Sequence, residues 1–503
     1  MKRQGMKARI ARFAREGGGT AVIAMAARVS GQFAMVAVTL VATRHLGPAD
    51  FGLFAIAGAF VMLARTMLYT GPFEYLLKAA PERERETTSA CLAATVAVAC
   101  GWTLLLAAIG LAAPMLFRGS GVAGVILTLA PSVLLAAFAA FAEAAMLRSG
   151  AVRRYYAITV VAEFGAGLAA IALLVGGWGI WALVVQIYAR IALLIVALGG
   201  FGPRLALVRP AFGEVITVLR WSISRFGSVL VGFLANYSGD LVLGVVFSPA
   251  AAGLYRASNR MVTALADMFV QPAGMLALTT LAAERAGRSG GGAGAGAGAG
   301  AGEARPGAWL RLTALFAALG WPALAVLALF ANRLVLLALG PAWAAAGPVV
   351  AVFCLARMAA LVTAVASAAL VVADRQGRVL AVQSAAAGAT AALTVLVAPF
   401  GARAAALAAT LVAVVTAVVL VRAALRREEH AALVEAARLV LFPLAGAFGA
   451  AFAADRLAMH APTLLALALP LACAAAGWLI AVWPVAPAFR RAAALLAEAP
   501  RPA

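Results

Sequence analysis

Charged residues are scarce in this sequence. Of 503 residues, 12% are charged and 65% are hydrophobic. A soluble domain carries roughly 25% charged and 45–50% apolar residues, so this composition cannot cover a surface that faces water. Disordered chains are poor in apolar side chains, and disorder is therefore excluded as well.

Cysteine and histidine are also rare, and they are scattered along the chain. The cysteines are Cys91, Cys100, Cys354 and Cys473, and the histidines are His45, His430 and His460. No Cys-x-x-Cys pair occurs, so the sequence supports neither a disulfide framework nor a zinc site. A Gly-x-x-x-x-Gly-Lys-Ser/Thr phosphate loop is missing too, which argues against ATP hydrolysis by this chain. We expect no cofactor.

Long apolar runs dominate what is present. A bilayer core takes about 20 apolar residues per helix. By this measure we predict fourteen transmembrane helices. They lie near residues 18–43, 49–70, 88–116, 121–147, 155–176, 178–200, 221–247, 250–282, 309–331, 343–373, 378–399, 401–423, 437–458 and 461–484. The segments lack the alternation of a lipid-facing strand, so the predicted fold is an all-α polytopic membrane protein.

The basic residues fall on one side of these spans. The chain has 40 Lys and Arg against 19 Asp and Glu, a formal charge of +21. Most of the basic residues lie in alternate connecting segments, starting with the N-terminal one, as the positive-inside rule predicts for cytoplasmic loops. We therefore predict that both termini are cytoplasmic. The basic excess marks topology, and nucleic acid is not an expected partner.

Connecting segments are short throughout, and the longest contains an alternating glycine and alanine run from Gly290 to Gly302. Such a run behaves as a flexible linker and cannot form a catalytic domain. This argues against a membrane glycosyltransferase or polymerase, which stays a minor alternative. The predicted parts are a basic tail (1–17), an N-lobe of six helices (18–200), a C-lobe of six helices (201–424) with a Gly/Ala linker (289–307), and two final helices with a cytoplasmic tail (425–503).

A short motif occurs twice. Residues 48–54 read PADFGLF and residues 249–255 read PAAAGLY, both Pro-Ala-x-x-Gly-Leu-aromatic. Six predicted spans separate the copies, so both have the same orientation. A parallel duplication of six-helix bundles around a central cavity is one plan of secondary transporters. The alternative is a chance similarity in an alanine-rich chain.

Seven arginines lie within the predicted spans. They are Arg28, Arg65, Arg190, Arg225, Arg256, Arg260 and Arg357. Facing lipid, they would cost on the order of 20 kcal/mol together, so we expect them to face the protein interior, a wet cavity or the interface. At 100° per residue, Arg256, Arg260 and Asp267 share one face of their helix, and similar polar faces occur on the first and seventh spans. Three such faces predict a central aqueous cavity.

Arginine outnumbers acid inside the predicted spans, which favours an anionic substrate such as a phosphate. The candidate substrate-binding residues are Arg28, Gln32, Arg65, Arg256, Arg260 and Asn236. The acids Asp240, Asp267, Glu143 and Glu163 are either ion-pair partners or sites for a coupling H⁺ or Na⁺. Arg190 and Arg225 lie near the cytoplasmic ends, where a side chain can snorkel. Arg357 has no polar face around it, so a structural ion pair is equally plausible.

Two stretches resemble a known family. Residues 42–54, ATRHLGPADFGLF, resemble the Arg-x-Leu-Gly-Pro-x-x-Phe-Gly signature of polysaccharide-transport (oligosaccharide flippase) proteins of the multidrug/oligosaccharidyl-lipid/polysaccharide exporter superfamily. Residues 240–261, DLVLGVVFSPAAAGLYRASNRM, resemble the seventh-to-eighth helix region of that family. The resemblance follows most of the chain and weakens after about Arg422. The long Gly/Ala run departs from the family's usual loop.

The resemblance implies a bacterial inner-membrane flippase that moves an undecaprenyl-diphosphate-linked oligosaccharide to the periplasmic leaflet by alternating access, for lipopolysaccharide or exopolysaccharide synthesis. It implies that Arg28, Arg65, Arg256 and Arg260 hold the diphosphate. Expected partners are this lipid-linked substrate, membrane lipids, and a polysaccharide polymerase and export proteins. The first alternative is an ion-coupled multidrug-type exporter of the same superfamily, and another is a membrane scaffold that transports nothing.

Overall fold

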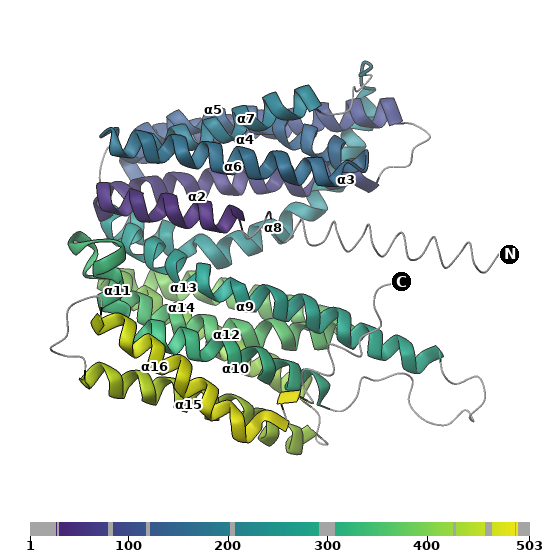
Figure 1. The fold of residues 1–503 in the computed structure, drawn as a ribbon. Coiled ribbons are helices and arrows are strands. Elements are labelled where there is room, and N and C mark those ends of the chain that lie inside the picture. The colour runs from purple at the N-terminus through teal and green to yellow at the C-terminus, as the bar shows by residue number, and fades with distance from the viewer. Residues whose placement is uncertain are drawn as a thin grey trace. The chain divides into compact units, whose positions relative to one another are not determined.

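A computed structural model of the chain describes residues 27, 30–78, 84–116, 121–201, 207–290, 307–425, 429–457, 465–487 and 489–490. Every regular element in these residues is a helix (Figure 1). Thirteen helices of the described part are long and apolar enough to cross a membrane. They correspond to the second through fourteenth predicted spans, which confirms the polytopic all-α class. The first predicted span, 18–43, lies partly outside the described residues. Its second half is helical, and this helix covers residues 30–45.

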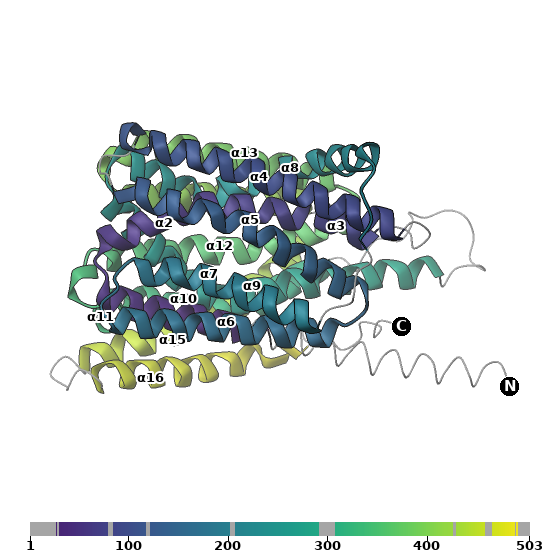
Figure 2. The same cartoon turned by 90° about the horizontal axis from the view of Figure 1, so that it is seen from above.

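The chain divides into two compact units, which are described separately. Unit 1 holds residues 1–257, 338–343 and 394–402. Its helices are α2 (Pro48–Thr70), α3 (Pro72–Lys78), α4 (Glu84–Leu116), α5 (Gly121–Arg148), α6 (Val152–Val175), α7 (Trp181–Phe201), α8 (Phe212–Val246), the first turns of α9 (Pro249–Gly290), and the short η2 (Pro341–Trp343) and η3 (Ala398–Phe400). Within unit 1, α5 packs against α2, α4 and α7, and α6 packs against α7 (Figure 2).

Unit 2 holds the remaining residues. Its helices are the rest of α9, α10 (Ala308–Leu329), α11 (Ala331–Ala338), α12 (Ala346–Val372), α13 (Gln376–Val397), α14 (Ala402–Ala424), α15 (His430–Leu457), α16 (Leu465–Val482) and η5 (Trp483–Val485). α10 packs against α12 and α15, and α15 packs along α16 (Figure 1). A buried apolar cluster that includes Trp309, Leu361 and Leu439 joins α10, α12 and α15.

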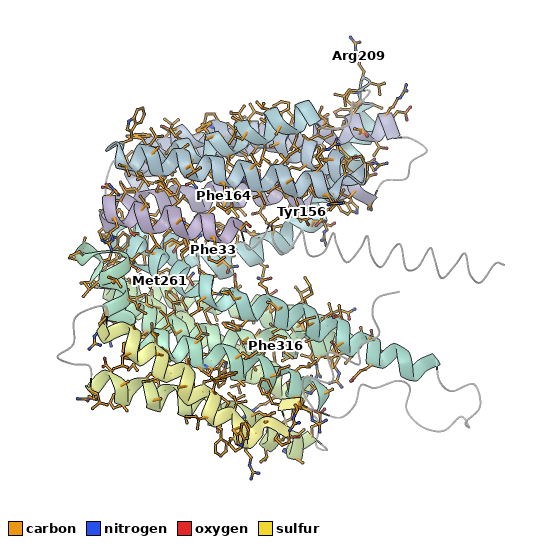
Figure 3. The ribbon with its side chains drawn as sticks, viewed as in Figure 1. Phe33, Tyr156, Phe164, Arg209, Met261 and Phe316 are labelled. Carbon is orange, nitrogen blue, oxygen red and sulfur yellow. The ribbon has the colours of Figure 1, made fainter. Side chains whose placement is uncertain are left out.

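Large apolar side chains cover much of the outer surface. Leu104, Met115, Phe212 and Leu479 are all at least 64% exposed. Exposure of this apolar surface to water would be unfavourable, whereas the hydrocarbon core of a membrane is itself apolar and solvates it well. The helical backbone satisfies its own hydrogen bonds, as the hydrocarbon core requires. Charged Arg209, in contrast, lies beyond the helices at one end of unit 1, in the segment before α8 (Figure 3).

Several helices are longer than the predicted spans. α8 begins at Phe212, where the apolar pattern predicts a start near 221, and α9 reaches Gly290 instead of 282. A separate helix, α3, follows α2 after Gly71. The reason is physical: hydropathy marks only the part of a helix that lies in hydrocarbon, whereas polar turns such as those at Arg220 and Arg285 continue the helix beyond it.

The two copies of the repeated motif contact each other within unit 1. A Cβ atom on Gly52 would overlap the backbone oxygen of Pro249, and a Cβ atom on Gly253 would overlap the backbone oxygen of Pro48. The fifth residue of each copy thus meets the first residue of the other. Each proline begins its helix, where its missing N–H leaves no hydrogen bond unmade. The starts of α2 and α9 therefore cross at backbone distance.

Unit 2 has a similar crossing between α15 and α16. A Cβ atom on Gly446 would overlap Gly477, and the reverse also holds. Small residues allow helix backbones to approach closely in membranes. Trp478 of α16 donates a hydrogen bond from Nε1 to the backbone oxygen of Ala318 on α10, at 2.8 Å. These contacts hold α10, α15 and α16 together.

Candidate functional site

A polar network lies inside unit 1, between α2, α5, α6 and α7. Its centre is Glu143 of α5, a residue that is only 2% exposed. Tyr69 of α2 donates its hydroxyl to Oε1 of Glu143 at 2.7 Å, and Tyr155 of α6 donates to Oε2 at 3.0 Å. Both carboxylate oxygens of a membrane-buried acid are therefore hydrogen-bonded, which reduces the cost of burying it.

The same network contains two arginines. Nε of Arg190 on α7 donates to Oε1 of Glu163 on α6 at 2.5 Å. Arg65, one turn before Tyr69 on α2, lies close enough to interact electrostatically with Arg190, Glu143 and Glu163. Among the described residues, the buried Nε of Arg65 and Nη1 of Arg190 have no hydrogen-bond partner. Two guanidinium groups thus keep buried donors available in one region.

A second charged pair in unit 1 joins α8 and α9. Nη1 of Arg256 lies 3.2 Å from Oδ2 of Asp240, and Asp240 is fully buried. The guanidinium of Arg256 also stacks over the Tyr237 ring, with the carbon Cζ 4.4 Å from the ring centre. Such a cation–π contact adds to the ion pair where water is excluded. An anion that binds Arg256 must therefore compete with Asp240.

The other predicted site residues lie in different settings. Gln32 is half-buried on the helical residues 30–45, and Asn236 is exposed on α8, where its Nδ2 donates to the backbone oxygen of Gly232 at 2.8 Å. Arg260 and Asp267 are half-buried on the part of α9 that belongs to unit 2. Arg28 falls outside the described residues.

Several polar partners were not expected from the sequence. Arg225 of α8 pairs with Glu74 of α3, with Nε 2.9 Å from Oε2. Arg357 of α12 donates from Nη2 to Oδ1 of Asn259 on α9 at 2.8 Å. Periodicity identifies the polar face of one helix and not the helix that meets it, so the sequence carries no direct signal for these pairs. Tyr69 could have been recognised, because it lies one turn from Arg65 on the same face.

The arrangement offers charged and hydroxyl groups and no metal-binding cluster. Among the residues that the structure describes, no group of three or more His, Cys, Asp or Glu side chains comes together to hold a metal ion. Buried guanidinium donors can hold the oxygens of a phosphate, and a buried carboxyl between two phenols can accept a proton or a small cation. Binding and release are the chemistry that these groups support.

Residues 40–287 match the family model described as "polysaccharide biosynthesis protein". The match spans just under half of the chain, so it shows which family this part of the chain resembles. The match covers the helix after the first predicted span, the whole unit-1 polar network and both copies of the repeated motif. None of the curated proteins compared with the chain matches it.

Solved structures of transporters share the fold. "Lipid II flippase MurJ, inward closed conformation" superposes with a TM-score of 0.72 at 10% identity, covering 94% of this chain and 98% of the flippase. An inward-facing multidrug resistance MATE transporter of the MOP superfamily gives a TM-score of 0.59 at 15% identity, covering 80% of this chain and 96% of the transporter. At these identities the likeness establishes the fold alone: this chain has the same architecture as these two transporters.

Proposed function

We propose that the chain is a flippase that carries a polyprenyl-diphosphate-linked oligosaccharide from the cytoplasmic to the periplasmic leaflet by alternating access. The membrane would be the bacterial inner membrane, with both termini cytoplasmic. The observation that carries the proposal is the unit-1 network, in which Arg65 and Arg190 keep buried N–H donors without partners. The family match to polysaccharide biosynthesis supports the glycan as cargo, and the fold of a protein named a lipid II flippase supports the lipid carrier.

In this proposal the arginines bind the diphosphate while the polyprenyl tail stays in lipid. The arginines that contact the diphosphate are Arg65, Arg28, Arg256 and Arg260. Gln32 and Asn236 form neutral hydrogen bonds with sugar hydroxyls. Arginine suits the role because its planar fork donates two parallel hydrogen bonds to one phosphate. Asp240 keeps Arg256 neutralised until the substrate's negative charge replaces it.

The acids of the network provide a route for coupling to an ion gradient. Glu143 and Glu163 lie beside the two arginines, and Asp240 and Asp267 lie along α8 and α9. Protonation of Glu143, or binding of Na⁺ to it, would change the net charge next to Arg65 and so its affinity for a diphosphate. Coupling of this kind makes release depend on the gradient.

The test is export of surface glycan in a host that lacks its own copy of this gene. Arg65→Ala, and Arg256→Ala combined with Arg260→Ala, should each abolish export while the protein remains inserted. Arg333→Ala is the matched control, because Arg333 pairs with Asp455 within unit 2 and is not a proposed binding residue, so export should stay intact. Normal export by the Arg65 and Arg256/Arg260 variants would remove these residues from the binding site.

A multidrug-type exporter is the second candidate, and the fold it shares with the MATE transporter favours it. Resistance of a sensitised host to cationic drugs, with no change in surface glycan, would establish this function in place of the first. Incorporation of labelled sugar by the purified protein alone would instead reveal a glycosyltransferase or polymerase.

A further inference from the structure

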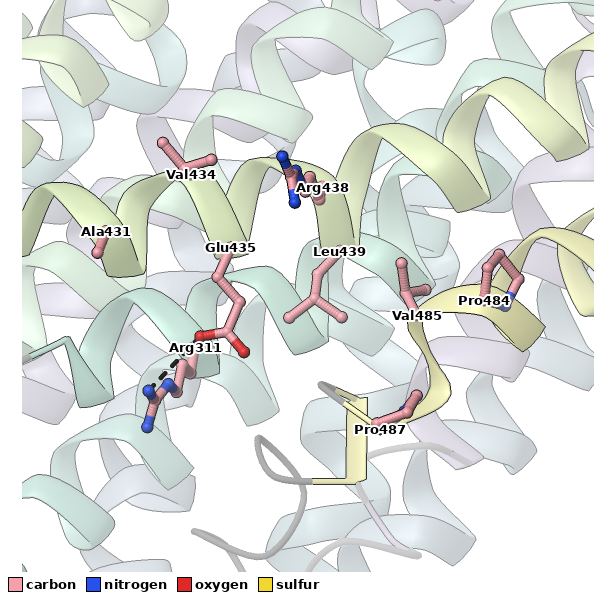
Figure 4. Close-up of a pocket in the computed structure, with 9 residues that line it drawn as sticks. All are labelled: Arg311, Ala431, Val434, Glu435, Arg438, Leu439, Pro484, Val485 and Pro487. Atoms are coloured by element: carbon pink, nitrogen blue, oxygen red, sulfur yellow. Dashed lines mark ion pairs between the residues drawn. The ribbon is translucent and has the colours of Figure 1, made fainter.

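A pocket of about 460 Å³ lies in unit 2, at one end of α10, α15 and α16, and none of its lining residues belongs to the proposed transport site. Its lining mixes two arginines and one acid with apolar side chains (Figure 4). The residues are Arg311, Ala431, Val434, Glu435, Arg438, Leu439, Pro484, Val485 and Pro487. Its volume lies within the range of small-ligand sites, roughly 300–1,000 Å³.

The charges of this pocket favour an anion. Nη2 of Arg311 lies 3.5 Å from Oε2 of Glu435, a long ion pair that neutralises one positive charge (Figure 4). The Nε atom of Arg311 is buried and has no hydrogen-bond partner in the described part of the chain. Arg438, one turn beyond Val434 on α15, is exposed, and no ion pair is found for it among the described residues. The lining therefore carries a net positive charge and donors that an anion can use.

The place of the pocket favours a lipid as the source of the anion. It is formed by the first turns of α10 and α15 and by the end of α16, all on the side that the positive-inside pattern predicts to be cytoplasmic. α15 has 28 residues, about 42 Å at 1.5 Å per residue, which exceeds the roughly 30 Å hydrocarbon core, so its first turns reach the headgroup layer. Trp483, 83% exposed beside the pocket, is typical of a side chain at this interface.

An apolar stripe continues from the pocket along α15. Val434, Leu441, Phe448 and Phe452 are each at least 41% exposed, and at 100° per residue they share a face about 40° wide. The rings of Phe448 and Phe452 are stacked, with centroids 6.4 Å apart. A free phosphate ion would gain nothing from this stripe, whereas an acyl chain attached to a phosphate would cover it.

We propose that this pocket binds the phosphate headgroup of an anionic membrane phospholipid, with one acyl chain along the exposed face of α15. Arg438 and the free Nε of Arg311 hold the phosphate, and Glu435 keeps Arg311 oriented. Basic pockets between helices on the cytoplasmic side are a known way of holding anionic headgroups. The proposal does not depend on the proposed transport activity. A lipid held there would join α15 to α10 and to the end of α16.

The experiment is native mass spectrometry of the full-length protein in detergent, with phosphatidylglycerol or phosphatidylcholine added at equal concentrations. We expect preferential binding of phosphatidylglycerol to the wild-type protein. Arg438→Gln should weaken this binding about tenfold, because a charge-assisted contact is lost. Arg403→Gln is the matched control: Arg403 is an exposed arginine near the start of α14 that does not line the pocket, so its loss should leave phosphatidylglycerol binding unchanged.

A second variant keeps the proposal testable if Arg438→Gln fails to fold. Glu435→Gln removes the one negative charge among the described lining residues and should strengthen phosphatidylglycerol binding about threefold, which a purely structural role for Glu435 would not do. Equal binding of the two phospholipids, or unchanged binding by both the Arg438 and Glu435 variants, would overturn the proposal. Displacement by equimolar inorganic phosphate would make it a free-phosphate site, and stronger binding of a polyprenyl diphosphate would make it a substrate site.

Discussion

The interior of unit 1 and the C-terminal helices of unit 2 differ in where their charged residues lie. In unit 1, Arg65, Glu143 and Arg190 lie between helices at membrane depth, in a network of ion pairs and phenol hydrogen bonds. In α15 and α16, charged residues occur only near the helix ends, as at Glu435 and Asp455. Mid-membrane charge is expensive and persists where it has a use, whereas end charges rest in the headgroup layer at little cost. The contrast separates the proposed substrate site from helices whose outer faces are exposed and apolar.

Removal of the central acid should give the largest effect. Glu143→Leu would leave the hydroxyls of Tyr69 and Tyr155 without an acceptor and would remove one of the two acids that act on the charge of Arg65. Each buried hydroxyl left without a partner costs roughly 1–3 kcal/mol of unfolding free energy, and the loss of a charge partner adds to this. The matched change Glu435→Leu, at a half-exposed pair near a helix end, should cost roughly 1 kcal/mol or less. Unfolding of the detergent-solubilised proteins measures both, and equal losses would show that the two regions do not differ in this way.

The sequence predicts which charged residues lie inside helices better than it predicts which helices those residues join. Apolar runs locate the helices, because the bilayer requires about 20 apolar residues to span it. The positions of Arg65, Glu143 and Glu163 inside predicted spans also follow from the runs. That Glu143 meets Tyr69, 74 residues away, does not follow, because helical periodicity is a property of one helix and the contact depends on how helices pack.

The repeated motif shows what the sequence does and does not predict about distant segments. Two similar turns, Pro48–Phe54 and Pro249–Tyr255, predict a duplication with a shared orientation. That their glycines lie against each other's prolines is found only in the structure. Nothing of this kind exists for the pocket residues Arg311 and Arg438, which come from unrelated turns.

Both regions contain a close crossing of two helix backbones at glycine, and a Gly→Ala substitution should lower stability at each crossing. Gly52→Ala forces a Cβ atom into the backbone of Pro249, and Gly446→Ala does the same at Gly477. Overpacking against backbone costs roughly 1–3 kcal/mol, so each variant should unfold at a lower temperature than the wild type. Gly58→Ala, on α2 with open space around it, is the control and should be neutral or stabilising, since alanine favours a helix. If Gly58→Ala lowered the unfolding temperature as much as Gly52→Ala, the effect would come from any change in α2 and not from the backbone crossing.

The smallest effect is expected from an ion pair at a helix end. Arg333 of α11 contacts Asp455 near the end of α15, and their side chains are 42% and 21% exposed. Arg333→Gln should lower stability by roughly 0–1 kcal/mol, because solvent screens the pair and the freed Asp455 can be hydrated. The difference between the wild type and this variant should shrink as salt rises towards 1 M, where the screening length falls to about 3 Å. Arg190→Gln offers the sharper contrast, because Arg190 also interacts electrostatically with the buried Glu143, so this variant should lose more stability than Arg333→Gln. A large, salt-insensitive loss for Arg333→Gln would instead place that pair in a water-excluded setting and end the distinction between the two regions.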